Sequence, residues 1–218
     1  MPDIAKINNV EVANISKLDS ITFADGMKVN NQDVSLATEA HTLIATATAS
    51  ASSTLSFTSG IDSTYDAYEF RFTNMHPATN GVDFRFQVNA AGASGFNETM
   101  TTTVFRAAHD EADSATTLTY QTSDDQAQGT GYQSIGNYGG NDNDQAVSGV
   151  LTLYAPSSTT YVKHFTARAT DHMAHDQAGD FFVAGYINVT AAIDEISFAM
   201  SSGNIDAGVI KMYGIAKA

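Results

Sequence analysis

Apolar and polar residues alternate along two long stretches of the chain, as they do in a strand with one buried and one exposed face. In residues 67–73, Tyr68, Phe70 and Phe72 fall on one face, and the charged residues between them fall on the other. Residues 82–89 repeat the pattern, with apolar residues at even positions and polar residues at odd positions. Both stretches are therefore predicted to be half-buried strands. Further strands are expected at residues 54–58, 100–107, 117–122, 147–154, 161–168, 181–189, 195–200 and 208–213.

Turns rich in Gly, Asn, Asp and Ser separate these stretches, and no segment shows a sustained helical period. The pattern predicts an all-β fold, an antiparallel β-sandwich of jelly-roll type. Residues 110–114 and 123–145 are expected to form long loops. Such loops gather at the ends of a sandwich, where binding sites are common.

The N-terminus carries a repeat, because Lys6, Lys17 and Lys28 lie eleven residues apart. After each lysine come an apolar residue, then Asn or Asp, then a second short polar residue and a new alternating stretch. An eleven-residue period is also compatible with a right-handed coiled coil. The Asn-Asn pairs, the β-branched residues and Gly26 favour turns and strands instead. Each unit is therefore expected to be a short strand, a tight turn and a second short strand.

A few short hairpins cannot bury their own apolar face, so this repeat arm is expected to lie against a partner, either sister chains or a neighbouring protein. The alternative is a flexible tail. The sequence thus divides into a repeat arm at residues 1–36, a low-complexity link at 37–53 and a β-sandwich domain at 54–218. The predicted partner-binding residues of the arm are Ile4, Ile7, Val10, Ile15, Leu18, Ile21, Phe23 and Val29.

The composition of the chain excludes several classes of function. The chain has 24 acidic and 10 basic residues, a net charge of -14, and no cysteine. A phosphate backbone would be repelled, so nucleic acid is not an expected partner. Disulfides and thiolate chemistry are excluded. The N-terminus does not have the pattern of a secretory signal, and no apolar run has the length of a membrane span. We therefore expect synthesis in the cytoplasm and no membrane partner.

Several segments together resemble structural proteins in the virions of tailed bacteriophages of aquatic bacteria. They are the closing strand-like stretches 192–198, 202–205 and 208–215, the opening Ile4–Val10 repeat, His76-Pro77 and Lys163-His164-Phe165. The chain has Val209 and Met212 where the closing pattern usually has Thr and Leu. The resemblance implies a jelly-roll component of a fibre, a tail or a head decoration, located in the virion and bound to other virion proteins. By analogy with fibres and decorations we expect a homotrimer. The resemblance carries over no catalytic residue.

Two clusters were considered as metal sites. His172 and His175 have HxxH spacing with flanking carboxylates and would suit zinc on a helix, whereas a polar loop is the alternative. Asp142 and Asp144 offer oxygen ligands for calcium, but the spacing of an EF-hand is missing and a solvated turn is the alternative. No other cofactor is expected.

The chain is not expected to be an enzyme, because it lacks the nucleophile and phosphate-binding motifs. A polysaccharide depolymerase is a remote alternative that would need two facing carboxylates. The acids near loops offer no distinguished pair: Glu98, Asp110, Glu111, Asp124 and Asp125. A second alternative is a carbohydrate-binding adhesin or receptor-binding module that recognises a glycan of the host surface. Tyr120, Tyr132 and Tyr138 would stack on its sugar rings, or they simply hold their loop in place.

Overall fold

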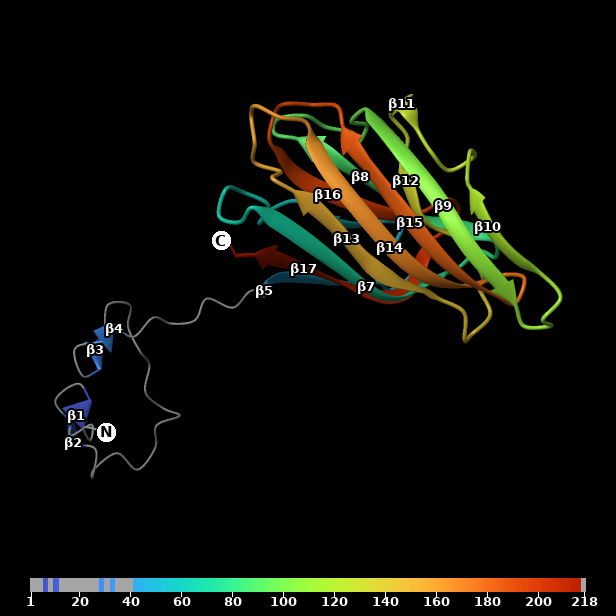
Figure 1. Ribbon diagram of the computed structural model, residues 1–218, viewed down its shortest axis with the longest axis horizontal. Coiled ribbons are helices and arrows are strands. Elements are labelled where there is room, and N and C mark those ends of the chain that lie inside the picture. The colour runs from blue at the N-terminus through green and yellow to red at the C-terminus, as the bar shows by residue number, and fades with distance from the viewer. Residues whose placement is uncertain (1–5, 8–9, 12–27, 30–31, 34–40, 217–218) are drawn as a thin grey trace. The chain divides into compact units, whose positions relative to one another are not determined.

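The computed structural model describes residues 6–7, 10–11, 28–29, 32–33 and 41–216. The chain divides into two compact units, Met1–Glu39 and Ala40–Ala218 (Figure 1). Every described element of secondary structure is a strand. No helix among these residues has the length and hydropathy needed to cross a membrane.

The described part of the first unit consists of two short antiparallel strand pairs. β1 (Lys6–Ile7) pairs with β2 (Val10–Glu11), so that Lys6 lies opposite Glu11. β3 (Lys28–Val29) pairs with β4 (Gln32–Asp33) in the same register, with Lys28 opposite Asp33. The first and third repeats therefore pair in the same way. Of the predicted partner-binding residues, Ile4, Ile15, Leu18, Ile21 and Phe23 lie outside the described residues, so the docking role of the arm stays a prediction.

The second unit contains one antiparallel sheet of thirteen strands. Their bounds are β5 (His41–Thr48), β6 (Leu55–Phe57), β7 (Ala67–Pro77), β8 (Val82–Ala90), β9 (Met100–Asp110), β10 (Thr116–Tyr120), β11 (Ala127–Gly129), β12 (Gln133–Gly139), β13 (Val147–Tyr154), β14 (Lys163–Met173), β15 (Gln177–Ile187), β16 (Ile193–Met200) and β17 (Ile205–Ile215). Hydrogen bonding connects them in the order β5–β17–β7–β13–β14–β12–β8–β16–β6. From β14 the sheet also continues through β15 to β9, which pairs with both β10 and β11. Because β6 returns to the vicinity of β5, the sheet is nearly closed and barrel-like.

The core is filled by the aromatic residues that the alternation placed on one face. Phe198 of β16 is fully buried, and its ring centroid lies 5.7 Å from that of Phe70 in β7 and 5.8 Å from that of Phe84 in β8. Phe57 in β6 and Phe86 in β8 complete its ring contacts, at 6.4 Å and 6.5 Å. Residues from β7 thus meet residues from β6, β8 and β16 across the interior, so this ring cluster joins strands that are far apart in sequence.

The structure confirms the all-β, antiparallel prediction, and each of the strand ranges predicted within residues 54–218 contains a strand. One detail of the alternation differs. Gln87 and Asn89 of β8 were expected on an exposed face, yet both are buried. The Gln87 amide donates hydrogen bonds to the backbone oxygens of Glu98, Thr130 and Gly131. These carbonyl groups take the place of water as hydrogen-bond acceptors, which allows the side chain to be buried.

Two ranges predicted as a low-complexity link and as a long loop contain strands. Within the predicted link 37–53, residues 41–48 form β5, an edge strand that pairs with β17. Its Thr and Ala residues fit a half-exposed strand although they show little alternation. Within the predicted loop 123–145, residues 133–139 form the largely buried strand β12. A Cβ on Gly136 would lie 2.8 Å from Val147 Cγ1, so close packing requires the glycine that suggested a loop.

Candidate functional site

One face of the β13–β14–β15–β9 part of the sheet is open to solvent. β14 shows this most clearly, because His164, Thr166, Arg168 and Thr170 are exposed while the residues between them are buried. The same alternation on β15 and β9 directs Phe182 and Phe105 to this side. Figure 1 shows the four strands side by side. We call this surface the outer face.

Strand register aligns side chains across the outer face. Val150 of β13 lies opposite Arg168 of β14, and Arg168 lies opposite Phe182 of β15. Phe182 lies opposite Phe105 of β9, which in turn lies opposite Tyr120 of β10. Opposite residues in antiparallel strands direct their side chains to the same side. These five residues therefore form one row, the aromatic row.

The side chains of the aromatic row are held in fixed positions. The rings of Phe105 and Phe182 stack nearly parallel, with centroids 4.7 Å apart. The Arg168 guanidinium lies over Phe182, with Cζ 4.6 Å from the ring centroid. Arg168 also donates to both carboxylate oxygens of Asp180, through Nε at 3.1 Å and Nη2 at 2.8 Å. Because this ion pair is exposed, it adds little stability, and its main effect is to orient the planar groups.

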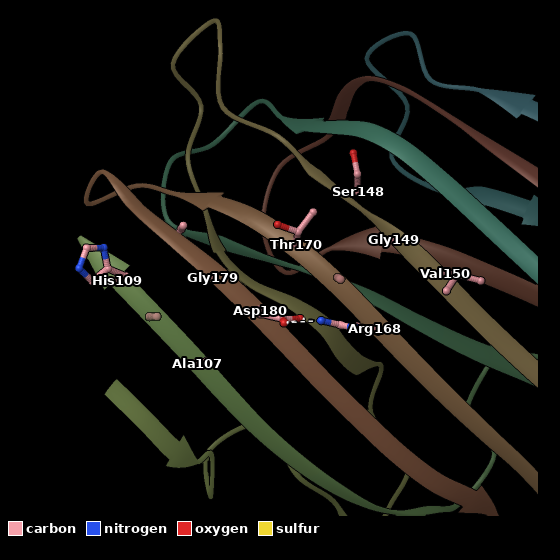
Figure 2. A pocket seen from close by; sticks show the side chains of 12 residues that line it. Ala107, His109, Ser148, Gly149, Val150, Arg168, Thr170, Gly179 and Asp180 are labelled. Atoms are coloured by element: carbon pink, nitrogen blue, oxygen red, sulfur yellow. Dashed lines mark hydrogen bonds and ion pairs between the residues drawn. The ribbon is translucent and has the colours of Figure 1, made fainter. Parts of the chain in front are cut away.

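Two hollows flank the aromatic row. The first, of about 570 Å³, is lined by Ala107, His109, Ser148, Thr170 and Asp180 among others (Figure 2). The second, of about 280 Å³, lies beside small residues of the neighbouring row, which include Thr103, Thr152, Thr166 and Ala184. Both hollows include Val150 and Arg168 in their walls, so they are neighbours on the outer face, and we call the two hollows together the furrow. Its width results from the Ala, Thr, Ser and Gly side chains that line it.

A second polar feature lies on the inner side of β14, where Asp171 is buried. Neither carboxyl oxygen of Asp171 has a hydrogen-bond partner. The pKa of Asp171 is raised to about 7, mainly by burial and also by the charge of Asp83, whereas the backbone N–H of Asn137 and the charge of Arg106 act in the opposite direction. Asp171 is therefore expected to change its protonation state near neutral pH.

Strand β12 connects Asp171 to further acids. Asn137 donates to Asp124 at 2.7 Å and accepts from Arg106 at 3.3 Å. Burial is also the main cause that raises the pKa of Asp124, followed by the charge of Asp83. Together these five residues form a polar cluster in which Asp171 and Asn137 are buried and the other three are half-buried. Within the described parts of the chain, no three His, Cys, Asp or Glu side chains are grouped in a way that would hold a metal ion.

The three tyrosines considered for glycan binding lie in different surroundings. Tyr120 belongs to the aromatic row, and its hydroxyl donates to Asp125 at 2.6 Å. Tyr138 lies in β12, where its ring centroid is 5.1 Å from that of His175. Tyr132 is half-buried just before β12. Only Tyr120 therefore shares the outer face with Phe105 and Phe182, which the sequence reasoning had not selected.

The residues considered for metal binding also separate. His172 lies in β14, with Nε2 3.8 Å from a carboxylate oxygen of Glu111, and His175 lies in the turn that follows. The helix that would align the two imidazoles is replaced by a strand and a turn. Asp142 and Asp144 are exposed in the β12–β13 connection, where the Asp142 backbone oxygen lies 3.1 Å from His76 Nε2.

Two of the acids considered for a depolymerase have visible structural roles. Glu98 accepts a hydrogen bond from the Ala90 amide at 3.0 Å. Asp110 accepts hydrogen bonds from the Ser114 hydroxyl and from the amides of Ala115 and Ser114, and these bonds lower its pKa. Both carboxylates therefore stabilise turns at strand ends.

Comparison of the chain with known protein families, with curated proteins and with solved structures finds no match.

Proposed function

We propose that this chain is a structural component of a bacteriophage virion, an accessory fibre, tail or head-decoration protein, and that it functions by binding and not by catalysis. The observation that carries the binding role is the outer face. Phe105, Leu118, Tyr120 and Tyr154, four large apolar side chains with high exposure, all belong to it. Large exposed apolar groups collected on one surface are typical of interaction sites. The assignment to a virion rests on the sequence resemblance described above.

The proposal also covers how the strands of the second unit are arranged in layers. We infer that the barrel-like sheet is organised as a sandwich of jelly-roll type, with β7 and β14 in one layer and β8 and β16 in the other. Ring contacts between Phe72 and Phe84 and between Phe86 and Phe165 support two facing layers. The pairing of β12 with β14 involves one residue pair, Gly139 and Met173, as expected for a narrow junction between layers.

In this proposal the repeat arm is the docking element, and the virion protein is a homotrimer whose second unit is displayed outward. The apolar residues of the arm recur at a fixed period, and its first and third repeats pair in one register. A repeated apolar segment with little core of its own is suited to packing against other copies or a neighbouring protein.

Removal of residues 1–37 tests this role. Because β5 begins at His41 and the second unit contains the described core, the shortened chain is expected to fold with a melting temperature close to that of the full chain. It is expected to be absent from phage particles purified on a density gradient, whereas the tagged full chain copurifies. Normal incorporation of the shortened chain would show that the arm is not the anchor.

The carbohydrate-binding module remains the second candidate, because Tyr120 lies in the aromatic row beside exposed Phe105. A depolymerase stays a remote alternative, and an assay for hydrolysis of host-envelope polysaccharides distinguishes it from a module that only binds.

A further inference from the structure

We infer that the furrow on the outer face binds an uncharged polysaccharide chain, with the exposed Phe105 ring, held in place by Phe182, as its platform. This inference rests on the proposed binding function and names the ligand class of that face. It places the site on β9, β14 and β15, and not at Tyr132 and Tyr138.

The rings provide the apolar part of such a site. Phe105 is 43% exposed, and its ring is nearly parallel to that of Phe182, at an interplanar angle of 5°. Because the two rings stack face to face and the Arg168 guanidinium lies over Phe182, the apolar surface open to a ligand is the exposed part of the Phe105 ring. An immobilised aromatic ring of this kind is one on which the C–H face of a sugar ring stacks. Tyr120 extends the same row and adds a hydroxyl at its edge.

Polar groups with fixed directions lie beside the rings. The bidentate pair of Arg168 and Asp180 borders the first hollow, and Figure 2 shows it spanning β14 and β15. A guanidinium offers donors in a rigid fork, and a carboxylate offers acceptor positions, which together complement neighbouring sugar hydroxyls. Further hydroxyls line the furrow: Thr103, Ser148, Thr152, Thr166 and Thr170.

The charge of the outer face favours a neutral ligand. Arg168 and, on the adjoining strand β7, Arg71 are the exposed arginines on this side of the sheet, and each is paired with a carboxylate, Asp180 at 2.8 Å and Glu69 at 2.7 Å. An acidic polymer would have to displace these carboxylates and approach a chain of net charge -14. An uncharged polysaccharide displaces no carboxylate and is not repelled by the net negative charge.

The shape of the furrow also argues against a second copy of this chain as the occupant. A two-fold interface presents the same patch on both partners, so the patch must complement itself. Each copy has one aromatic row but two hollows beside it, so the row of a two-fold partner could fill only one of the two hollows. A linear chain of sugar rings fills both hollows.

Native gel electrophoresis of the full chain in gels that contain a polysaccharide tests the inference. We expect dextran, galactomannan or mixed-linkage β-glucan to retard the protein, and alginate, an acidic polysaccharide, to retard it less. Replacement of Phe105 by alanine is expected to weaken binding by about tenfold, as removal of a central aromatic contact does. Tyr161→Ala is the matched control, because Tyr161 is an exposed aromatic residue in a loop that does not line the furrow. Its affinity should equal that of the unmodified chain.

A second variant tests the polar part of the site. Arg168→Lys keeps the charge but cannot form the fork, so a loss of about fivefold or more is expected. Absence of retardation by all three uncharged polysaccharides overturns the inference, as does equal loss in Phe105→Ala and Tyr161→Ala. If light scattering shows that Phe105→Ala converts an oligomer into monomers, the furrow is an interface between copies and the inference is wrong. Incorporation into phage particles is measured separately, so a failure of the ligand assignment remains distinct from a failure of the virion assignment.

Discussion

Replacement of Asp171 by asparagine is expected to make the protein more stable at alkaline pH and to remove much of the pH dependence of its unfolding. In the folded chain the pKa of Asp171 is about 7, raised mainly by burial, against an ordinary value of 3.8. The folded state therefore holds the proton more tightly than the unfolded state does. Stability from this group is fully present below the ordinary pKa and is lost as the pH rises through about 7.

Urea unfolding between about pH 5.5 and about pH 8.5 measures the effect. At about 1.4 kcal/mol for each pKa unit, the free energy of unfolding of the unmodified chain should fall over this range by roughly 2 kcal/mol more than that of Asp171→Asn. Asp176→Asn is the matched control, because it makes the same chemical change at an exposed position in the next turn. It should retain the pH dependence of the unmodified chain. Equal pH profiles for Asp171→Asn and the unmodified chain would contradict the buried titration.

Replacement of Phe198 by alanine is expected to lower the free energy of unfolding by about 3–5 kcal/mol, because it removes a fully buried ring and leaves a cavity. Phe198 contacts Phe57, Phe70, Phe84 and Phe86, so the loss affects both sides of the core. Denaturant unfolding at a pH near neutrality provides the measurement.

The control for Phe198→Ala is Phe105→Ala, which removes the same side chain from the exposed outer face. This variant should lower the free energy of unfolding by less than about 1 kcal/mol, since it removes little buried apolar surface. A similar cost for both variants would mean that Phe198 is not central to the core. The small cost expected for Phe105→Ala also makes this variant suitable for binding measurements.

Much of the fold was predictable because alternating apolar and polar residues indicate which face of a strand is buried. Tyr68, Phe70 and Phe72 are buried as expected. Strand β12 was missed because, apart from Ile135, its buried positions are occupied by Gly, Gln, Ser and Asn, whose burial depends on hydrogen bonds and close packing that only the folded chain supplies. Strand β5 was missed because Ala and Thr carry little hydrophobic contrast.

The candidate site was only partly predictable. Tyr120 was selected as an aromatic residue beside a loop, but its row depends on the register of five strands, which local sequence does not determine. A signal for Asp171 did exist. In residues 163–173 it occupies the same alternation phase as Phe165, Ala167 and Ala169, so a strand that extends beyond the predicted end at residue 168 directs its side chain inward.

The central claim is that the outer face, at the aromatic row, is where this protein binds its ligand. Side-chain and backbone N–H resonances of the labelled full chain, recorded during titration with the uncharged polysaccharides, test it directly. The Nε–H resonance of Arg168 and the amides of Phe105 and Phe182 are expected to shift together, while the amide of Tyr161 stays unchanged. Shifts centred on Tyr138, or no shift at Arg168, Phe105 and Phe182, would contradict the claim.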